Sequence, residues 1–299
     1  YNTAVGNNAL RGTTDTDITG DENVAIGAGS MKFNIAGALN TAVGRSSLYT
    51  NTSGSNNTAL GYQSLWSNTT GSSNTASGYK SLYANTTGTR NLAIGYNAYD
   101  NADTENDNLA IGYDALGGAI DGGAFNIAIG NYSLDANTTG GYNTATGYSS
   151  LTGNTTGDAN TAYGNQTLLG NTTGARNSAI GHQSLYTNET GSHNTAVGYS
   201  VLTTATGNSN TGIGATALTS NTTGQYNVAV GMNVLRDQTT AHSNVAVGHN
   251  AGNTGTNDIT TGGSNTLLGA STAADAATAT NQSVIGYGAS GQADNSVTL

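Results

Sequence analysis

A glycine that lies four residues after an asparagine returns 17 times along this chain of 299 residues. Glutamine replaces the asparagine once, at Gln282, and 12 of the 16 intervals between the glycines are 17 residues long. Such a fixed period is the signature of a solenoid, in which each repeat stacks on its neighbours. The repeats begin near residues 2, 23, 40, 57, 74, 91, 108, 126, 143, 160, 177, 194, 210, 227, 244, 265 and 282. We therefore expect a single repeat domain over residues 1–299, as a fragment of a longer fibre.

Composition narrows the classes of partner and cofactor. Seven Lys and Arg stand against 17 Asp and Glu, which gives a net charge of −10. Nucleic-acid binding needs clustered Lys and Arg, so no nucleic-acid partner is expected. Cysteine is absent, which excludes disulfides and cysteine metal sites. No apolar run approaches the roughly 18 residues that suggest a membrane-spanning helix, so no membrane span is expected.

The repeat can be numbered with the asparagine at position 1 and the glycine at position 5, as in NTALGYQSLWSNTTGSS at 57–73. Positions 2–4 predict a short strand, in which positions 2 and 4 share one face and position 3 takes the other. Positions 7–10 predict a second strand, with the frequent leucine at position 9 pointing inward. Asn-Thr-Thr-Gly at positions 12–15 predicts a turn whose glycine takes a positive φ. One repeat is then one coil of an all-β fold, a parallel β-roll or β-solenoid of about 17 coils.

The asparagine and the glycine of the pentapeptide are interpreted as structural. We expect the asparagine side chains to bond to one another as a ladder from coil to coil. The glycine is expected to end the first strand with a positive φ. Members of these two columns include Asn57, Gly61, Asn74, Gly78, Asn91, Gly95, Asn194 and Gly198.

The core of a single coil is expected to be thin. Its apolar content is one Val, Ile or Leu at position 4, one Leu at position 9 and the Ala at position 3. Burying three such side chains stabilises a coil by only about 5 kcal/mol, whereas ordering each residue costs about 1–2 kcal/mol of backbone entropy. The alanines, on the face opposite the coil's own core, would form a flat apolar stripe for another chain. We therefore predict a homotrimeric rod whose chains share a core.

The pentapeptides NVAIG (23–27), NLAIG (91–95) and NVAVG (244–248) resemble the head repeats of YadA-like trimeric autotransporter adhesins. The fuller unit is similar to the repeat blocks of phage-type tail fibres that precede an intramolecular chaperone domain. The resemblance covers nearly the whole chain. It implies a left-handed parallel β-roll that assembles as a trimer in an extracellular fibre.

Aromatic residues recur at two positions of the repeat. Tyrosine occupies position 6 in four consecutive repeats, and position 10 adds further rings such as Trp66. Two interpretations are open, a strip on which sugar rings stack and a structural ladder that covers a corner of the coil, and we favour the ladder. The candidate contact residues of these columns are Tyr62, Tyr79, Tyr96, Tyr113 and Trp66.

Two longer turns, at 11–22 and 253–263, carry acidic residues, among them Asp15, Asp17 and Asp258. A third acidic cluster comprises Asp100, Asp103, Glu105 and Asp107. Clustered carboxylates can bind Ca²⁺, but no EF-hand or calcium-repeat spacing is present, so we expect no metal or other cofactor. We interpret the turns as protruding loops suited to partner contact.

These features favour a structural and adhesive segment of a trimeric extracellular fibre, either a tail fibre of a virion or an adhesin of a bacterial cell surface. Its expected partners are two further copies of the chain and a host or cell-surface receptor, with a glycan among the candidates. No catalytic triad, nucleophile elbow or phosphate loop appears, so the chain is not expected to be an enzyme. Two alternatives stay open, an ice-binding β-solenoid and a glycan-cleaving fibre.

Overall fold

The computed structural model describes residues 1–12 and 18–299. Within these ranges there is no helix, and each strand is two or three residues long. The chain is an all-β parallel β-solenoid of about 17 turns, as the repeat predicts. Each three-residue strand begins one residue after a predicted repeat start, at position 2. We describe the coils in two units, residues 1–156 and 157–299.

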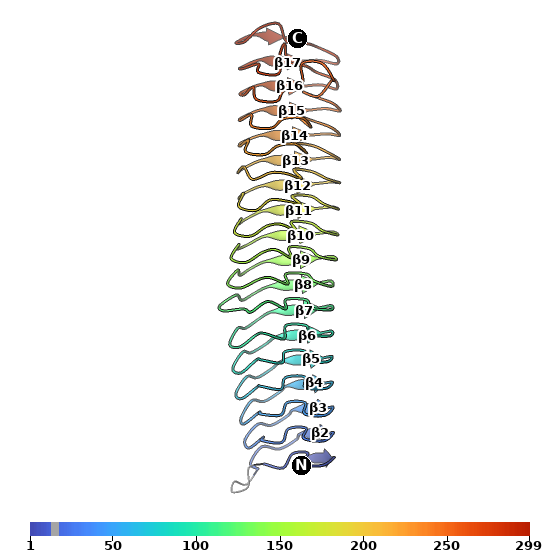
Figure 1. The fold of residues 1–299 in the computed structure, drawn as a ribbon, viewed down its shortest axis with the longest axis vertical. Helices are drawn as coiled ribbons and strands as arrows, with labels where there is room; N and C mark the ends of the chain where they lie inside the picture. The colour runs from blue at the N-terminus through green and yellow to red at the C-terminus, as the bar shows by residue number, and fades with distance from the viewer. Residues whose placement is uncertain (13–17) are drawn as a thin grey trace. The chain divides into compact units, whose positions relative to one another are not determined.

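The first unit contains nine strands stacked in sequence order (Figure 1). Each strand pairs in parallel and in register with the next, so that Thr41 faces Thr58 and Ala42 faces Ala59. Equal positions of successive repeats therefore form columns along the unit. The strands are β1 (Thr3–Val5), β2 (Val24–Ile26), β3 (Thr41–Val43), β4 (Thr58–Leu60), β5 (Thr75–Ser77), β6 (Leu92–Ile94), β7 (Leu109–Ile111), β8 (Ile127–Ile129) and β9 (Thr144–Thr146).

The second unit repeats this arrangement. Its strands also pair in parallel, and Ala179 of one coil faces Ala196 of the next. The strands are β10 (Thr161–Tyr163), β11 (Ser178–Ile180), β12 (Thr195–Val197), β13 (Thr211–Ile213), β14 (Val228–Val230), β15 (Val245–Val247), β16 (Thr266–Leu268), β17 (Ser283–Ile285) and β18 (Val297–Thr298).

The alanine at position 3 lies inside the coil, so the predicted outward alanine stripe is wrong. Ala59 is fully buried, whereas Leu60 at position 4 is 40% exposed. The space at this point varies from coil to coil: Leu267 and Val284, at position 3 of the last two repeats, are fully buried, whereas the coil with Gly212 at position 3 has little room. A Cβ there would lie 2.5 Å from Cγ1 of Val201, which replaces the usual small residue at position 8. The side chains of positions 2 and 4 face outward.

Positions 7–10 form a turn and not the predicted second strand. Gln63 and Leu65, at positions 7 and 9, have φ of 55° and 50°, in the left-handed region where a strand cannot continue. Their N–H groups still donate to neighbouring coils, to the carbonyl oxygens of Arg45 and Ser81 at 3.1 and 3.0 Å. The inward direction of the leucine is confirmed, because Leu65 is fully buried.

The two glycines of the repeat have different roles. At position 5 the predicted positive φ is confirmed, with 134° at Gly61 and 136° at Gly198. At position 15 the prediction is wrong, because Gly71 lies outside the positive-φ region. It is glycine because a Cβ would lie 2.4 Å from Oδ1 of Asn68 in the same turn.

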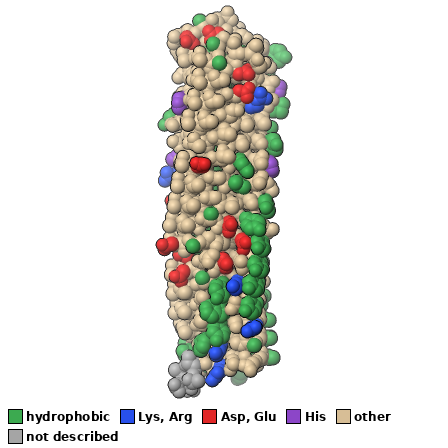
Figure 2. All heavy atoms as spheres, in the orientation of Figure 1, with side chains coloured by type: hydrophobic (Ala, Val, Ile, Leu, Met, Phe, Trp, Pro, Cys, Tyr) green, Lys and Arg blue, Asp and Glu red, His purple; other side chains and the backbone are tan. Residues whose placement is uncertain are grey.

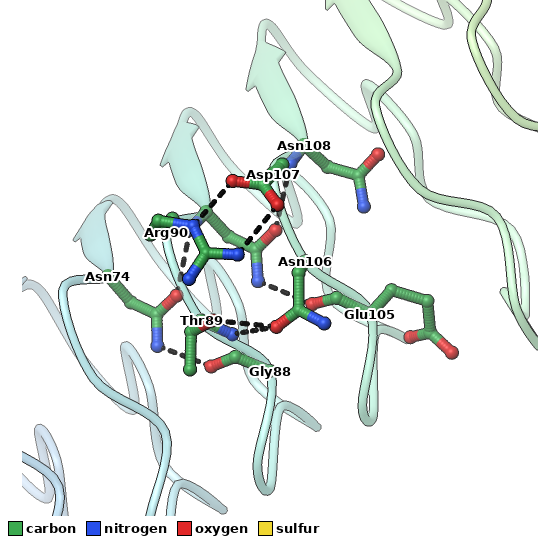
Figure 3. A network of polar contacts seen from close by, with 9 residues as sticks. Asn74, Gly88, Thr89, Arg90, Glu105, Asn106, Asp107 and Asn108 are labelled. Carbon is green, nitrogen blue, oxygen red and sulfur yellow. Dashed lines mark hydrogen bonds and ion pairs between the residues drawn. The ribbon is translucent and has the colours of Figure 1, made fainter.

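The predicted asparagine ladder is confirmed and lies in the interior. The backbone N–H of Asn74 donates to Oδ1 of Asn57 at 2.9 Å, and that of Asn91 donates to Oδ1 of Asn74 at 2.9 Å. The amide of Asn74 also donates to the carbonyl oxygen of Gly88 at 2.7 Å (Figure 3). In the second unit Asn194 accepts from the backbone N–H of Asn210 at 2.9 Å. Each buried amide is thus hydrogen-bonded to its own coil and to the next.

Candidate binding surface

Four tyrosines at position 6 of consecutive repeats form one continuous column in the first unit. The ring centroids of Tyr62 and Tyr79 are 5.4 Å apart, those of Tyr79 and Tyr96 4.8 Å, and those of Tyr96 and Tyr113 5.2 Å. All three pairs are stacked, with interplanar angles of 11°, 8° and 7°. The four side chains are 38–45% exposed. The in-register coils place them one above the next, as the sequence predicts.

Stacking decides which part of these rings a ligand can reach. Tyr79 and Tyr96 each have a tyrosine ring against both faces, so a sugar cannot cover either face fully. The outer edges of the rings and the phenol groups stay accessible. A ligand on this column would therefore contact a row of ring edges, and not the open ring faces on which single sugars usually stack.

A second aromatic column lies at position 10. Trp66 stacks between Tyr49 and Tyr83, with centroid distances of 5.7 and 5.4 Å and interplanar angles of 4° and 13°. The ring of Phe33 packs edge-on against Tyr49. All these side chains are half-buried, so this column both covers the coils and contributes to their surface.

Three cations lie on the aromatic columns. The guanidinium of Arg45 lies 5.8 Å from the ring centroid of Tyr62, at the start of the position-6 column. Nζ of Lys32 donates to the hydroxyl of Tyr49 at 3.1 Å, at the start of the position-10 column. Sequence reasoning did not assign these side chains to a site, although Arg45 and Lys32 occupy the repeat positions, 6 and 10, of the two aromatic columns.

Lys80 connects the two columns. Its Nζ lies 5.6 Å from the ring centroid of Tyr79 and 5.1 Å from that of Tyr83. Figure 2 shows hydrophobic side chains gathered over the lower coils, with Lys and Arg among them. We call this surface the aromatic–cationic face. It comprises Lys32, Arg45, Tyr49, Tyr62, Trp66, Tyr79, Lys80, Tyr83, Tyr96 and Tyr113.

An apolar column follows position 4 in both units, and we call it the position-4 column. In most coils its residue is Val, Ile or Leu; ten of these side chains are 36–59% exposed, and Ile111, Val197, Val230 and Leu268 are half-buried. Its exposed members are Val5, Ile26, Val43, Leu60, Ile94 and Ile129 in the first unit and Ile180, Ile213, Val247 and Ile285 in the second. Exposed apolar surface of this extent is typical of an interaction site.

Of the predicted acidic loop residues, the structure describes Asp258. Asp15 and Asp17 lie outside the described residues. Asp258 accepts the backbone N–H groups of Thr254 and Gly255, so its carboxylate shapes its own loop. No group of three or more His, Cys, Asp or Glu within 1–12 and 18–299 is placed to hold a metal ion.

The third acidic cluster is dispersed by the fold. Glu105 is 6% exposed and accepts the backbone N–H of Gly122, one coil further, at 3.1 Å. Asp107 forms an exposed ion pair with Arg90, from Nε to Oδ1 at 2.6 Å (Figure 3). The hydrogen bond from Arg90 lowers the pKa of the Asp107 carboxyl. These carboxylates therefore have separate structural partners.

Asp100 belongs to a different group of carboxylates. Burial, and then the charge of Asp114, raises the pKa of Asp100 from 3.8 to about 6. Burial and Asp114 also raise the pKa of Asp135, at the same repeat position two coils further. This carboxylate group marks the end of the position-10 aromatic column.

The chain matches no protein-family model and no curated protein sequence significantly. The resemblance to adhesin heads and tail-fibre repeats therefore stays a prediction. Among the residues that the structure describes, no helix is long and apolar enough to cross a membrane.

Proposed function

We propose that this chain is a structural and adhesive segment of a homotrimeric extracellular fibre, on a virion or a bacterial surface. The repeat supports this role, because stacked coils place the same side chains at each level of each unit. The protruding loops, including the one with Asp258, are proposed to contact a host or cell surface. We assign the segment no catalytic role and a left-handed coil, in line with its resemblance to fibre repeats.

The observation that carries this proposal is the exposed position-4 column. Burial of apolar surface drives protein association, and this column offers exposed Val, Ile or Leu in ten coils. A second and a third copy of the same chain present an identical column with the same spacing. Three position-4 columns facing a common axis would supply the apolar core that a single narrow coil lacks.

Absolute mass in solution, from light scattering behind a sizing column, tests the assembly. The chain is expected at three times its own mass. Replacing Val43 and Ile94 by aspartate places charges within the apolar column, so the double variant should lose the trimer. Thr70→Asp is the matched control, because Thr70 is exposed at position 14 of the turn.

A monomeric wild-type chain, or a trimer that survives both aspartates, would contradict the proposed interface. Circular dichroism of the same samples separates loss of assembly from loss of the coil. A Thr70→Asp variant that also dissociates would show that the assembly uses the turn and not the position-4 column.

A further inference from the structure

Charge is segregated along the chain. Residues 23–99 contain four cations, Lys32, Arg45, Lys80 and Arg90, and no Asp or Glu, in a chain whose net charge is −10. Arg90 is paired with Asp107 of the next coil. The other three all lie on the aromatic–cationic face. The segment is thus a positively charged part of an acidic molecule, and three of its cations gather on one face; Asp100, just past the segment, interacts electrostatically with Lys80.

We propose that the aromatic–cationic face binds a linear polysaccharide that carries carboxylates, with the sugar chain running along the stacked coils. This proposal rests on the proposed extracellular role and specifies the ligand class of its adhesive surface. The cations bind the carboxylates of the ligand, and the two aromatic columns contact its sugar rings.

The repeat of the aromatic rings fits an extended sugar chain. Successive rings are 4.8–5.7 Å apart, close to the coil spacing of about 4.8 Å. One pyranose adds a similar length to an extended chain, so successive sugars meet equivalent ring edges. The C–H groups of each sugar pack on those edges, and its hydroxyls bond to the phenol groups of the column. A ligand that needs only edges and hydroxyls is compatible with rings whose faces are already stacked.

The cation spacing fits a polymer of low charge density. Arg45 and Lys32 begin the two columns, and Lys80 lies two coils beyond Arg45. Double-stranded DNA carries a charge about every 1.7 Å, which three separated cations cannot match. Single-stranded nucleic acid binds by stacking bases on aromatic faces, and the faces of Tyr79, Tyr96 and Trp66 are covered by neighbouring rings.

A further copy of this chain fits the face poorly. Three copies of Lys32 and Arg45 brought to a common axis would place like charges together, and residues 23–99 offer no carboxylate to neutralise them. The position-4 column carries no such charge. The aromatic–cationic face is therefore expected to stay accessible in the trimer.

Trp66 is the single tryptophan of the chain and lies within the face, so its fluorescence reports on the site. We would titrate the full chain with polygalacturonate and with the same polymer after full methyl esterification, which removes the charge. A saturable change in Trp66 emission is expected with the acid form. Arg45→Gln combined with Lys80→Gln should weaken this binding roughly tenfold, because two partly exposed ion pairs are lost.

Arg176→Gln combined with Arg236→Gln is the matched control, since both arginines are exposed and belong to the second unit; Arg236 is paired with Asp237 there. Equal binding by the two double variants would overturn the proposal. So would equal binding of the esterified polymer, equal binding of poly(dT), or no emission change with polygalacturonate. Light scattering on the same sample separates the two proposals: a trimer that binds no polygalacturonate refutes only the ligand, and a monomer refutes the assembly.

Discussion

The coil at 57–73 and the coil at 91–107 have the same backbone period but different interiors. The first has Asn68 at position 12 and Gly71 at position 15, as most coils do. The second has Ala102 and Glu105 at these positions. The two changes occur together because the two positions share one small space. The comparison shows that substitutions in this solenoid are tolerated as pairs.

The shared space is visible in the distances. A Cβ on Gly71 would lie 2.4 Å from Oδ1 of Asn68, and one on Gly88 would lie 2.3 Å from Oδ1 of Asn85. Ala102 has no amide, so the larger Glu105 fits beside it. Among the coils of 17 residues, two others have a side chain at position 15, and both also lack the asparagine. They pair Gln238 with Ala241 and Ala276 with Ala279.

The largest expected effect comes from breaking such a pair in the regular coil. Gly71→Ala alone should destabilise the chain by about 3 kcal/mol, because its Cβ clashes with the Asn68 amide. Adding Asn68→Gln copies the pair formed by Gln238 and Ala241, and should recover about 1–2 kcal/mol. Gln238 still donates to Asn221 and to Ala241, so the longer amide keeps the ladder. Chemical denaturation of the two single variants and the double variant measures the coupling.

Recovery should be partial, since the Cβ of Gly71→Ala also lies 2.4 Å from the carbonyl oxygen of Gly88, which Asn68→Gln does not move. Thr70→Ala, in the same turn but exposed, controls for general effects on the turn. Strictly additive costs for the two substitutions would contradict the idea that positions 12 and 15 are coupled.

The substitutions in the 91–107 coil leave the polar groups satisfied toward the next coil but not toward the preceding coil. Tyr99 replaces the usual leucine at position 9, and its hydroxyl accepts from the amide of Asn108 at 2.7 Å. Burial raises the pKa of Tyr99, so the phenol stays protonated. On the other side, Oδ1 of Asn85 has no hydrogen-bond partner, because Ala102 supplies no amide to it. Asn188, which precedes a coil with Ala205 at position 12, has the same unpaired Oδ1.

Alanine substitution of two asparagines at position 12 should therefore destabilise the chain to different extents, with a smaller difference between them. Asn68 donates to Asn51 at 2.8 Å and accepts from Asn85 at 2.8 Å, so both of its amide atoms are bonded. Asn68→Ala should cost about 3 kcal/mol, and Asn85→Ala about 1 kcal/mol less, because the second variant removes an already unpaired acceptor. Denaturation midpoints of the two variants measure the difference. Equal costs would mean that Oδ1 of Asn85 is satisfied in solution.

Sequence periodicity alone predicts the columns of this molecule, but not the direction in which each one points. Alternation separates Ala59 from Thr58 and Leu60, yet it cannot say which set faces inward, and apolar content favoured Leu60. The inward choice depends on how much space Leu65 and the asparagine amides leave, which is a tertiary property. The cations Arg45 and Lys80 were missed for a related reason, since each is a single exception within a column of other residues.

The smallest effect concerns Asp100, which stands at position 10 where the regular coils have Trp66 and Tyr83. Its pKa is raised in the folded chain, to about 6 from 3.8. The protonated carboxyl of Asp100 therefore stabilises the folded chain fully below about pH 4, and this stabilisation is lost as the pH rises through 6. Asp100→Asn should raise the unfolding midpoint at pH 7, and the gain should vanish at pH 4. Asp107→Asn should give no gain at pH 7, because the pKa of Asp107 is lowered by Arg90. A gain for Asp100→Asn that persisted at pH 4 would assign the effect to packing and not to the charge.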